Sequence, residues 1–227
     1  MAIGPQNRVI PRTLERAEID AGLRAYMLRV YNYMASGLAL TGLVAFAVAS
    51  SETLVQTIFT SGLAWVVMLA PLAFVLLLSF RVHKMSVAGA QATFWVFAAV
   101  MGVSMASIFL VFTGASIARV FFITSATFAG MSLYGYTTKR DLTRWGSFLF
   151  MGLIGIIIAA LVNLFLASAA VHFAISVIGV IVFVGLTAYD TQRVKEIYLE
   201  SDAPETSTKK AIMGALALYL DFINLFV

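Results

Sequence analysis

The chain has 227 residues, of which 61% are hydrophobic and only 11% are charged, and its mean hydropathy is +0.96. A soluble globular domain is typically about 25% charged, so this shortage of charge predicts an integral membrane protein. Cysteine is absent, which excludes disulfides, thiol chemistry and cysteine-ligated metal centres. The net charge of +4 is not a nucleic-acid signature, because the basic residues stand in short links between apolar runs.

Residues Arg8–Arg29 mix basic and acidic side chains. They contain no short apolar core followed by a small-residue cleavage site, so a cleavable signal peptide is not expected. We predict a cytoplasmic N-terminal tail over residues 1–30 and a single transmembrane domain over residues 31–227.

Seven apolar runs follow, each close to the ~20 residues that a helix needs to cross ~30 Å of hydrocarbon. They are Tyr31–Ser50, Leu54–Phe80, Val87–Thr113, Ile117–Tyr136, Trp145–Ser168, Val171–Tyr189 and Ala211–Val227. The sequence therefore predicts an all-α membrane protein built as a bundle of seven transmembrane helices.

The 15 basic residues are distributed unevenly among the links between these runs. Only Arg119 lies on one side, between the third and fourth runs. The other side holds Arg8, Arg12, Arg16, Arg24, Arg29, Arg81, Lys84, Lys139, Arg140, Arg144, Arg193, Lys195, Lys209 and Lys210. Positive charge marks cytoplasmic links, so we predict a cytoplasmic N-terminus. Seven full crossings would place the C-terminus outside, whereas a re-entrant last segment would return it inside.

Two pairs of small residues are spaced four apart, Gly102 with Ala106 and Ala126 with Gly130. Such pairs allow helices to approach closely in lipid. We interpret both as ordinary packing positions of the bundle.

The sequence offers little for an enzyme. Its two histidines, His83 and His172, fall at opposite sides of the predicted membrane, and there is no HExxH motif or phosphate-binding glycine loop. The Gly-x-Gly-Asp stretch that accompanies aspartyl intramembrane proteases is also absent, so we expect no catalytic activity.

Two acidic residues, Asp190 and Asp221, stand in apolar runs. An acid at the centre of a membrane helix costs about 2.5–3.5 kcal/mol on insertion, and such residues usually face the bundle interior and carry function. In the last run, small and polar residues share one helical face. These residues are Gly214, Ala217, Asp221 and Asn224, opposite Leu216, Leu220 and Ile223; in the sixth run Gly179, Phe183, Thr187 and Asp190 lie along one face.

The two acids meet only if the last segment starts low or is bent, because Asp221 lies 11 residues beyond Lys210, about 16 Å of helix rise. If they meet, both cannot stay ionised, and the pair would share a proton and offer carboxylate oxygens to a divalent cation such as calcium. The alternative is two separate acids, each paired elsewhere. Arg81 is the natural basic partner of Asp190, as a cytoplasmic latch, or it is simply a positive-inside anchor.

Two stretches carry a resemblance to a known family. They are Ala188-Tyr189-Asp190-Thr191-Gln192 and Gly214-Ala215-Leu216-Ala217-Leu218-Tyr219-Leu220-Asp221-Phe222-Ile223-Asn224-Leu225-Phe226. Together with the seven-run layout they are similar to the signatures of the Bax inhibitor-1 family (transmembrane Bax inhibitor motif family, bacterial YccA-like branch). Relatives usually continue several residues further, so the last helix is expected to be incompletely represented.

The resemblance implies a seven-helix bundle of the bacterial inner (plasma) membrane, with the last helix enclosed by the other six. It implies a pH-sensitive calcium leak in which Asp190 and Asp221 sense protons and gate the path, with Arg81 as a latch. Calcium ions, protons and the lipid bilayer would then be its partners, and no cofactor would be required. The resemblance also allows a second function, a stress-response regulator that binds a membrane-bound ATP-dependent protease without conducting ions.

Overall fold

The computed structural model describes residues 12–227, with side chains described from residue 20 onward. This part of the chain is entirely helical apart from its links, with no strand. The elements in order are α1 (Arg12–Ala49), α2 (Glu52–Phe59), α3 (Leu63–Arg81), the short 3-10 turn η1 (Val82–Lys84), α4 (Val87–Val111), α5 (Gly114–Thr137), α6 (Thr143–Leu166), α7 (Ala169–Glu196) and α8 (Pro204–Phe226).

Six of the described helices are long and apolar enough to cross a membrane: α1 from Asp20, α3 with η1, α4, α5, α6 and α7. Their outward faces carry large apolar side chains, such as Phe165, which is 90% exposed, and Phe80, which is 77% exposed. Apolar surface of this extent is covered by lipid in an integral membrane protein. The protein is therefore an all-helical membrane protein.

The predicted seven spans differ from these six in two places. The run Leu54–Phe80 is split, because a turn at residues 60–62 separates the short helix α2 from α3. The run Ala211–Val227 falls within α8, which is not among the six, because its first turns are charged and Asp221 interrupts the apolar part. The part of the predicted tail from Arg12 to Val30 is helical and continuous with the first span; the domain division itself stays a prediction.

Serine and threonine side chains cap the helices that follow the short links. Ser51, Ser86, Thr113 and Ser168 precede α2, α4, α5 and α7, and each accepts a hydrogen bond from a backbone N–H of the first turn. Such a cap satisfies one of the N–H groups that a helix start leaves unpaired. Each helix can therefore start directly after a short link. Because the links are short, successive long helices run antiparallel.

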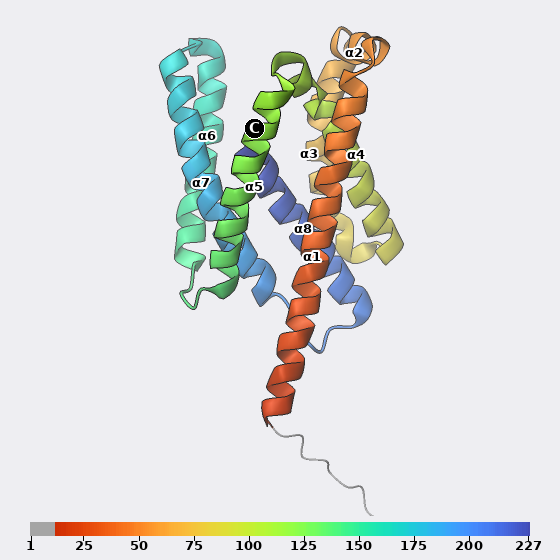
Figure 1. Cartoon of the computed structure of the whole chain (residues 1–227), viewed down its shortest axis with the longest axis vertical. Helices are drawn as coiled ribbons and strands as arrows, with labels where there is room; N and C mark the ends of the chain where they lie inside the picture. Colours follow the sequence, from red (N-terminus) through yellow and green to blue (C-terminus); the bar gives the residue numbers. More distant parts are fainter. Residues whose placement is uncertain (1–11) are drawn as a thin grey trace, which may run out of the picture.

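The links fall into two groups at opposite ends of the bundle (Figure 1). The α3–α4, α5–α6 and α7–α8 links lie at the end where the described part of α1 begins, and most of the basic residues belong to this group. The α4–α5 link, which precedes Arg119, lies at the other end with the α6–α7 link. The charge asymmetry of the sequence is thus an asymmetry of the folded molecule.

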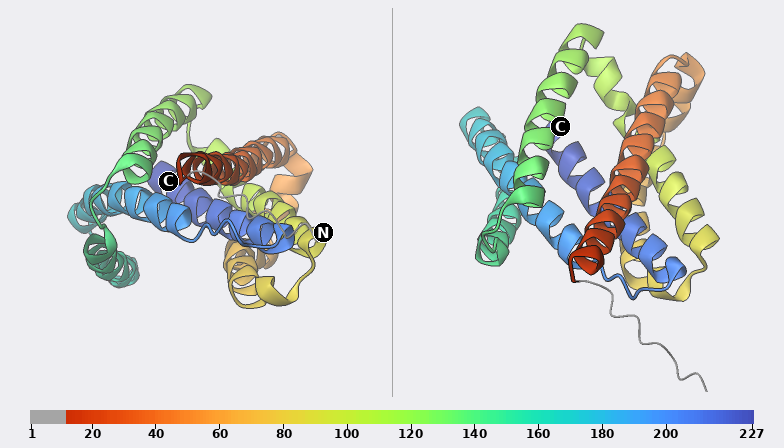
Figure 2. Two further views of the ribbon diagram at one scale, coloured as in Figure 1. Left: turned by 90° about the horizontal axis from the view of Figure 1, so that it is seen from below. Right: turned by 60° about the horizontal axis from the view of Figure 1, so that its bottom comes forward.

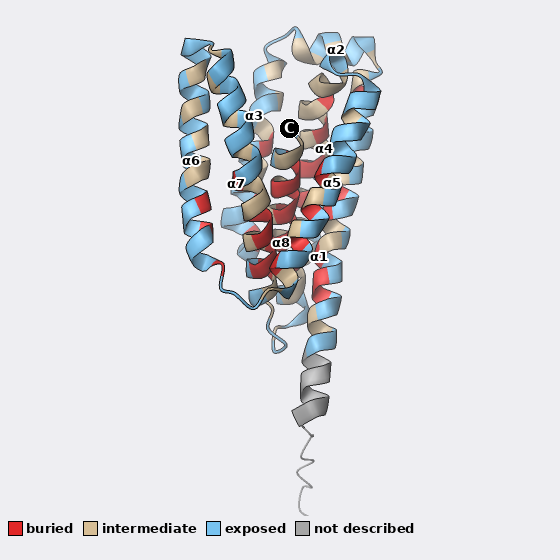
Figure 3. Ribbon diagram, turned by 60° about the vertical axis from the view of Figure 1, so that its left-hand side comes forward, coloured by how far each residue is buried: buried red, intermediate tan, exposed pale blue. Residues whose placement is uncertain are grey.

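Helix α8 runs obliquely to the long helices and packs against α1, α3, α4, α5 and α7 (Figure 2). Ten of its residues are buried, and Figure 3 shows buried positions concentrated along it and on the faces turned toward it. The remaining helices form two groups: α3 and α4 with α1 on one side, and α5 and α6 with α7 on the other. Helix α6 packs on α7 and has only Gly146 and Leu149 buried.

Of the two small-residue pairs, one packs as expected and the other does not. Gly102 and Ala106 are buried, and a Cβ on Gly102 would lie 2.6 Å from the carbonyl oxygen of Thr41 in α1. Ala126 and Gly130 are exposed, and a Cβ on Gly130 would meet no atom within 4 Å. The close contact of α5 occurs at Gly135 instead.

Gln192 fastens the α5–α6 link to α7. Its Oε1 accepts a hydrogen bond from the backbone N–H of Leu142 at 2.9 Å, and its Nε2 donates to the carbonyl oxygen of Arg140 at 2.8 Å. The Gln192 side chain is buried, and these two bonds give hydrogen-bond partners to its amide oxygen and nitrogen and to two backbone groups of the link.

We predict opposite effects for alanine at the two glycines of α5. A Cβ on Gly135 would lie 2.2 Å from the carbonyl oxygen of Ala188, so Gly135→Ala must separate α5 from α7 and cost about 1–3 kcal/mol. Gly130→Ala meets open space and should stabilise the helix by up to about 1 kcal/mol. Thermal unfolding midpoints in detergent compare the two, and equal midpoints would contradict the packing described.

We expect Gln192→Ala to free the α5–α6 link. The loss leaves the Leu142 N–H and the Arg140 carbonyl without partners, which costs about 1–3 kcal/mol. Hydrogen exchange at the Leu142 amide should accelerate strongly. The matched variant Gln192→Glu keeps the acceptor for Leu142 and should preserve most of the protection there, while losing the bond to Arg140.

The α5–α6 link also makes a pH-dependent contribution to the free energy of unfolding, through Asp141. Hydrogen bonds from the side chain and backbone N–H of Thr143 hold the pKa of the exposed Asp141 below its usual 3.8. Stability from a lowered pKa is present above the unfolded value and is lost as the pH falls through the folded one. The unfolding midpoint of the native protein should therefore exceed that of Asp141→Ala near neutral pH. The two should converge below pH 3.8, and a constant difference would contradict this.

Candidate functional site

Asp190 and Asp221 are brought together where α7 packs against α8. Their carboxyl groups lie close together and line the same cavity. Asp221 is only 5% exposed, and its Oδ2 is buried without a hydrogen-bond partner. A buried carboxylate oxygen without a partner is costly, and groups of this kind in a native fold are typical of functional sites.

The pair lies in the wall of a cavity of about 630 Å³ between α3, α6, α7 and α8. Its lining contains charged, polar and apolar side chains. The lining residues are Ser79, Gly146, Ser147, Phe150, Leu153, Phe183, Leu186, Tyr189, Asp190, Arg193, Ala217, Leu220, Asp221 and Asn224. Asp190 stands about two turns before the end of α7, so the cavity is nearer the basic end of the bundle.

The predicted small-polar face of α8 lines this cavity in part. Ala217, Asp221 and Asn224 do so, but Gly214 faces Val194 of α7, where a Cβ would lie 2.7 Å from that side chain. Leu220, expected on the opposite face, also lines the cavity. The polar stripe is therefore shorter than the helical spacing suggests.

In α7, Phe183 and Asp190 line the cavity as the sequence predicts, whereas Thr187 is fully buried and donates a hydrogen bond to the carbonyl oxygen of Phe183. The two acids meet because α8 begins at Pro204, well before the apolar run, and runs obliquely to the long helices (Figure 2). The difference in membrane depth between Asp190 and Asp221 that the sequence suggested is therefore absent from the fold.

Arg81 is not brought to Asp190 in this structure. It is exposed at the end of α3, and the ion pairs among the described side chains are Lys209–Glu205 at 2.9 Å and Lys210–Asp202 at 2.6 Å. The positive charge that acts on Asp190 is that of Arg193, which lines the same cavity. The role of Arg81 as a latch stays a prediction.

Tyr219 holds the segment of α8 that carries Asp221. Its side chain is fully buried, and its hydroxyl lies 2.7 Å from the hydroxyl of Thr41, which also donates to the carbonyl oxygen of Ala98. Its ring packs edge-on against that of Phe97, with 5.1 Å between centroids. Tyr219 stands two residues before Asp221, so its contacts fix this segment of α8 to both α1 and α4.

A second polar chain joins three helices on the other side of α7. The hydroxyl of Tyr31 in α1 lies 2.7 Å from that of Ser132 in α5, which lies 3.0 Å from that of Thr191 in α7. Thr191 and Gln192 both stand in the motif quoted above, yet sequence reasoning assigned neither a contact. Their polarity beside Asp190 in an apolar run is the signal that could have found them.

The described side chains contain no group of three or more histidine, cysteine, aspartate or glutamate residues that could hold a metal ion. The two carboxylates, the amide of Asn224 and the hydroxyls of Ser79 and Ser147 line the same cavity, and their oxygens are of the kind that calcium takes as ligands.

Residues 23–227 match the family model described as "Inhibitor of apoptosis-promoting Bax1". The inner membrane protein YbhL of Escherichia coli (strain K12) is 47% identical over 220 residues, which cover 96% of this chain and 94% of that protein. The uncharacterized protein RP147 of Rickettsia prowazekii (strain Madrid E) is 49% identical over 220 residues, covering 97% and 93%. An uncharacterized membrane protein of Streptococcus pyogenes serotype M3 is 31% identical over 211 residues, covering 92% and 91%. By this family match and these relatives, the chain belongs to the Bax inhibitor-1 family of integral membrane proteins.

Proposed function

We propose that the protein is a pH-sensitive, calcium-permeable leak channel in which Asp190 and Asp221 form the proton sensor and gate. The observation that carries this proposal is the contact between the two carboxyl groups, with one oxygen of Asp221 buried and unpartnered. Two acids in contact in a poorly solvated site share a proton, and the pair gains or loses charge as a unit. That change of charge occurs on two different helices at once.

Calcium suits this site as a passing ion. Carboxylate, amide and hydroxyl oxygens line the cavity, and calcium prefers oxygen ligands. Because only two of these groups are acids, calcium would bind weakly, which favours conduction over retention.

The cavity lined by Asp190 and Asp221 is called the acid cavity below. Helix α8 separates it from a second cavity of about 440 Å³ between α1, α4, α5 and α8. The acid cavity is lined by Leu220, Asp221 and Asn224, and the second cavity by Phe222, Ile223 and Phe226 of the same helix. In this proposal α8 is the enclosed seventh helix of the bundle. A displacement of its C-terminal half, driven by the charge of the acid pair, would connect the two cavities.

The basic end of the bundle would face the cytoplasm of a bacterial inner membrane, with the N-terminus inside. The E. coli relative is named as an inner membrane protein, which supports this location. Protons would then reach the pair from the cytoplasmic side. Arg81 follows Ser79 of the cavity wall by two residues, and in this proposal a swing of its side chain toward ionised Asp190 closes the site.

The double variant Asp190→Asn/Asp221→Asn tests the proposal. Asparagine keeps the size of aspartate but cannot change charge. Liposomes that contain the native protein and a calcium-sensitive dye should show calcium entry that differs several-fold between about pH 6 and about pH 8. In the double variant we expect that difference to disappear.

The matched control is Glu200→Gln, which removes an exposed acid at the same end of the bundle and should leave calcium entry and its pH response unchanged. Unchanged flux in the double variant would contradict the acid gate. Absence of flux from correctly folded native protein would contradict the channel itself and favour a regulator of a membrane-bound ATP-dependent protease.

A further inference from the structure

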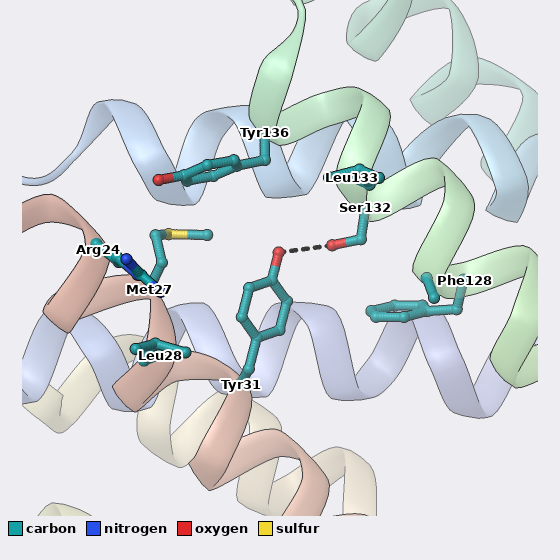
Figure 4. A pocket seen from close by; sticks show the side chains of 9 residues that line it. Arg24, Met27, Leu28, Tyr31, Phe128, Ser132, Leu133 and Tyr136 are labelled. Carbon is teal, nitrogen blue, oxygen red and sulfur yellow. Dashed lines mark hydrogen bonds between the residues drawn. The ribbon is translucent and has the colours of Figure 1, made fainter. Parts of the chain in front are cut away.

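A groove of about 540 Å³ lies between α1 and α5, on the flank of the bundle away from the acid cavity. Figure 4 shows its side chains. Those from α1 are Arg24, Met27, Leu28 and Tyr31, and those from α5 are Phe128, Ala129, Ser132, Leu133 and Tyr136. Its volume falls within the range of about 300–1,000 Å³ of ligand sites.

The groove is apolar along most of its length and positively charged at one end. Arg24 stands at the end nearest the start of α1, and Phe128 stands at the opposite end (Figure 4). The one polar pair in the floor, Tyr31 with Ser132, is already hydrogen-bonded at 2.7 Å and so needs no polar ligand. From Phe128 to Tyr136 the groove follows α5 for about 12 Å of helix rise, which matches an extended hydrocarbon segment.

A second positive charge stands beside the charged end. The Nζ of Lys195 lies 5.7 Å from the centre of the Tyr136 ring and donates a hydrogen bond to the carbonyl oxygen of Tyr136 at 2.8 Å. Arg24 itself is exposed, and none of the ion pairs among the described side chains involves it. Arg24 and Lys195 therefore present positive charge on the side of the bundle where the basic links gather.

We propose that this groove binds an anionic glycerophospholipid of the adjacent leaflet, with an acyl chain along Leu28, Phe128 and Ala129 and the phosphate at Arg24. Charge complementarity selects the occupant. Basic pockets between membrane helices, at the end where positive charge gathers, bind acidic lipid head groups, whereas an acyl chain alone would leave Arg24 without a counter-charge. The proposal does not depend on calcium conduction, because no residue of the acid pair lines the groove.

Native mass spectrometry of the full chain in detergent, mixed with phosphatidylglycerol or phosphatidylcholine of equal chain length, tests this. The native protein should retain phosphatidylglycerol in preference to phosphatidylcholine. Arg24→Gln should lower retention of phosphatidylglycerol about fivefold and leave phosphatidylcholine unchanged, since one basic residue near the surface contributes about 1 kcal/mol. The matched control Lys84→Gln removes a positive charge from the same end of the bundle, outside the groove, and should change neither.

Two further variants fill the groove without touching its charge. Ala129 and Leu28 are exposed, so Ala129→Phe and Leu28→Trp should fold and should lower retention of both lipids. Equal retention of the two lipids by the native protein would overturn the proposal. So would an equal loss in Lys84→Gln and Arg24→Gln, or unchanged retention of phosphatidylglycerol in both groove-filling variants.

Discussion

Tyr219 is buried where α8 crosses α1 and α4, and its hydroxyl group shares the Thr41 hydroxyl with the carbonyl oxygen of Ala98. In the hydrocarbon layer an unpaired hydroxyl is costly, so this arrangement holds α8 at one height and one rotation. Asp221 follows two residues later and is carried to α7, where Asp190 stands. The site is thus positioned by a contact made outside it. The α5–α6 link is likewise held by a residue outside it, because Gln192 of α7 accepts a hydrogen bond from the backbone of that link.

The sequence predicted the class of protein and most of the helices, and it left open whether the two acids meet. Apolar length and charge asymmetry suffice for the class and the helices, because the bilayer imposes both. The division of the run Leu54–Phe80 was missed, since α2 and α3 are both apolar and only the turn at residues 60–62 separates them. The packing role given to Ala126 and Gly130 was wrong, because small residues mark a close approach only where a partner helix is present.

The partner of Asp190 shows a different limit. The sequence places Arg81 at the end of a helix and at the membrane level of Asp190, but level alone does not determine where a side chain lies. In the fold Arg81 is exposed, and Arg193, three residues after Asp190 on the same helix, lines the cavity. Neighbours along a helix are brought together by its 3.6-residue repeat, whereas neighbours between helices depend on rotations that a single sequence does not encode visibly. The contacts of Gly214 and Leu220 escaped prediction for the same reason.

The main packing contacts divide the bundle into two sets of three helices, α1 with α3 and α4, and α5 with α6 and α7, and α8 packs against both sets. Direct contact between the sets is slight, and one cavity lies on each flank of α8. The two sets are therefore joined mainly through α8, and separating them in the membrane plane would leave most other contacts between helices intact. Separation changes the area that the protein occupies in the bilayer, so lateral tension acts on the same displacement that would widen the acid cavity. Membrane tension would thereby bear on the width of the acid cavity, which α3 of one set and α6 and α7 of the other line together with α8.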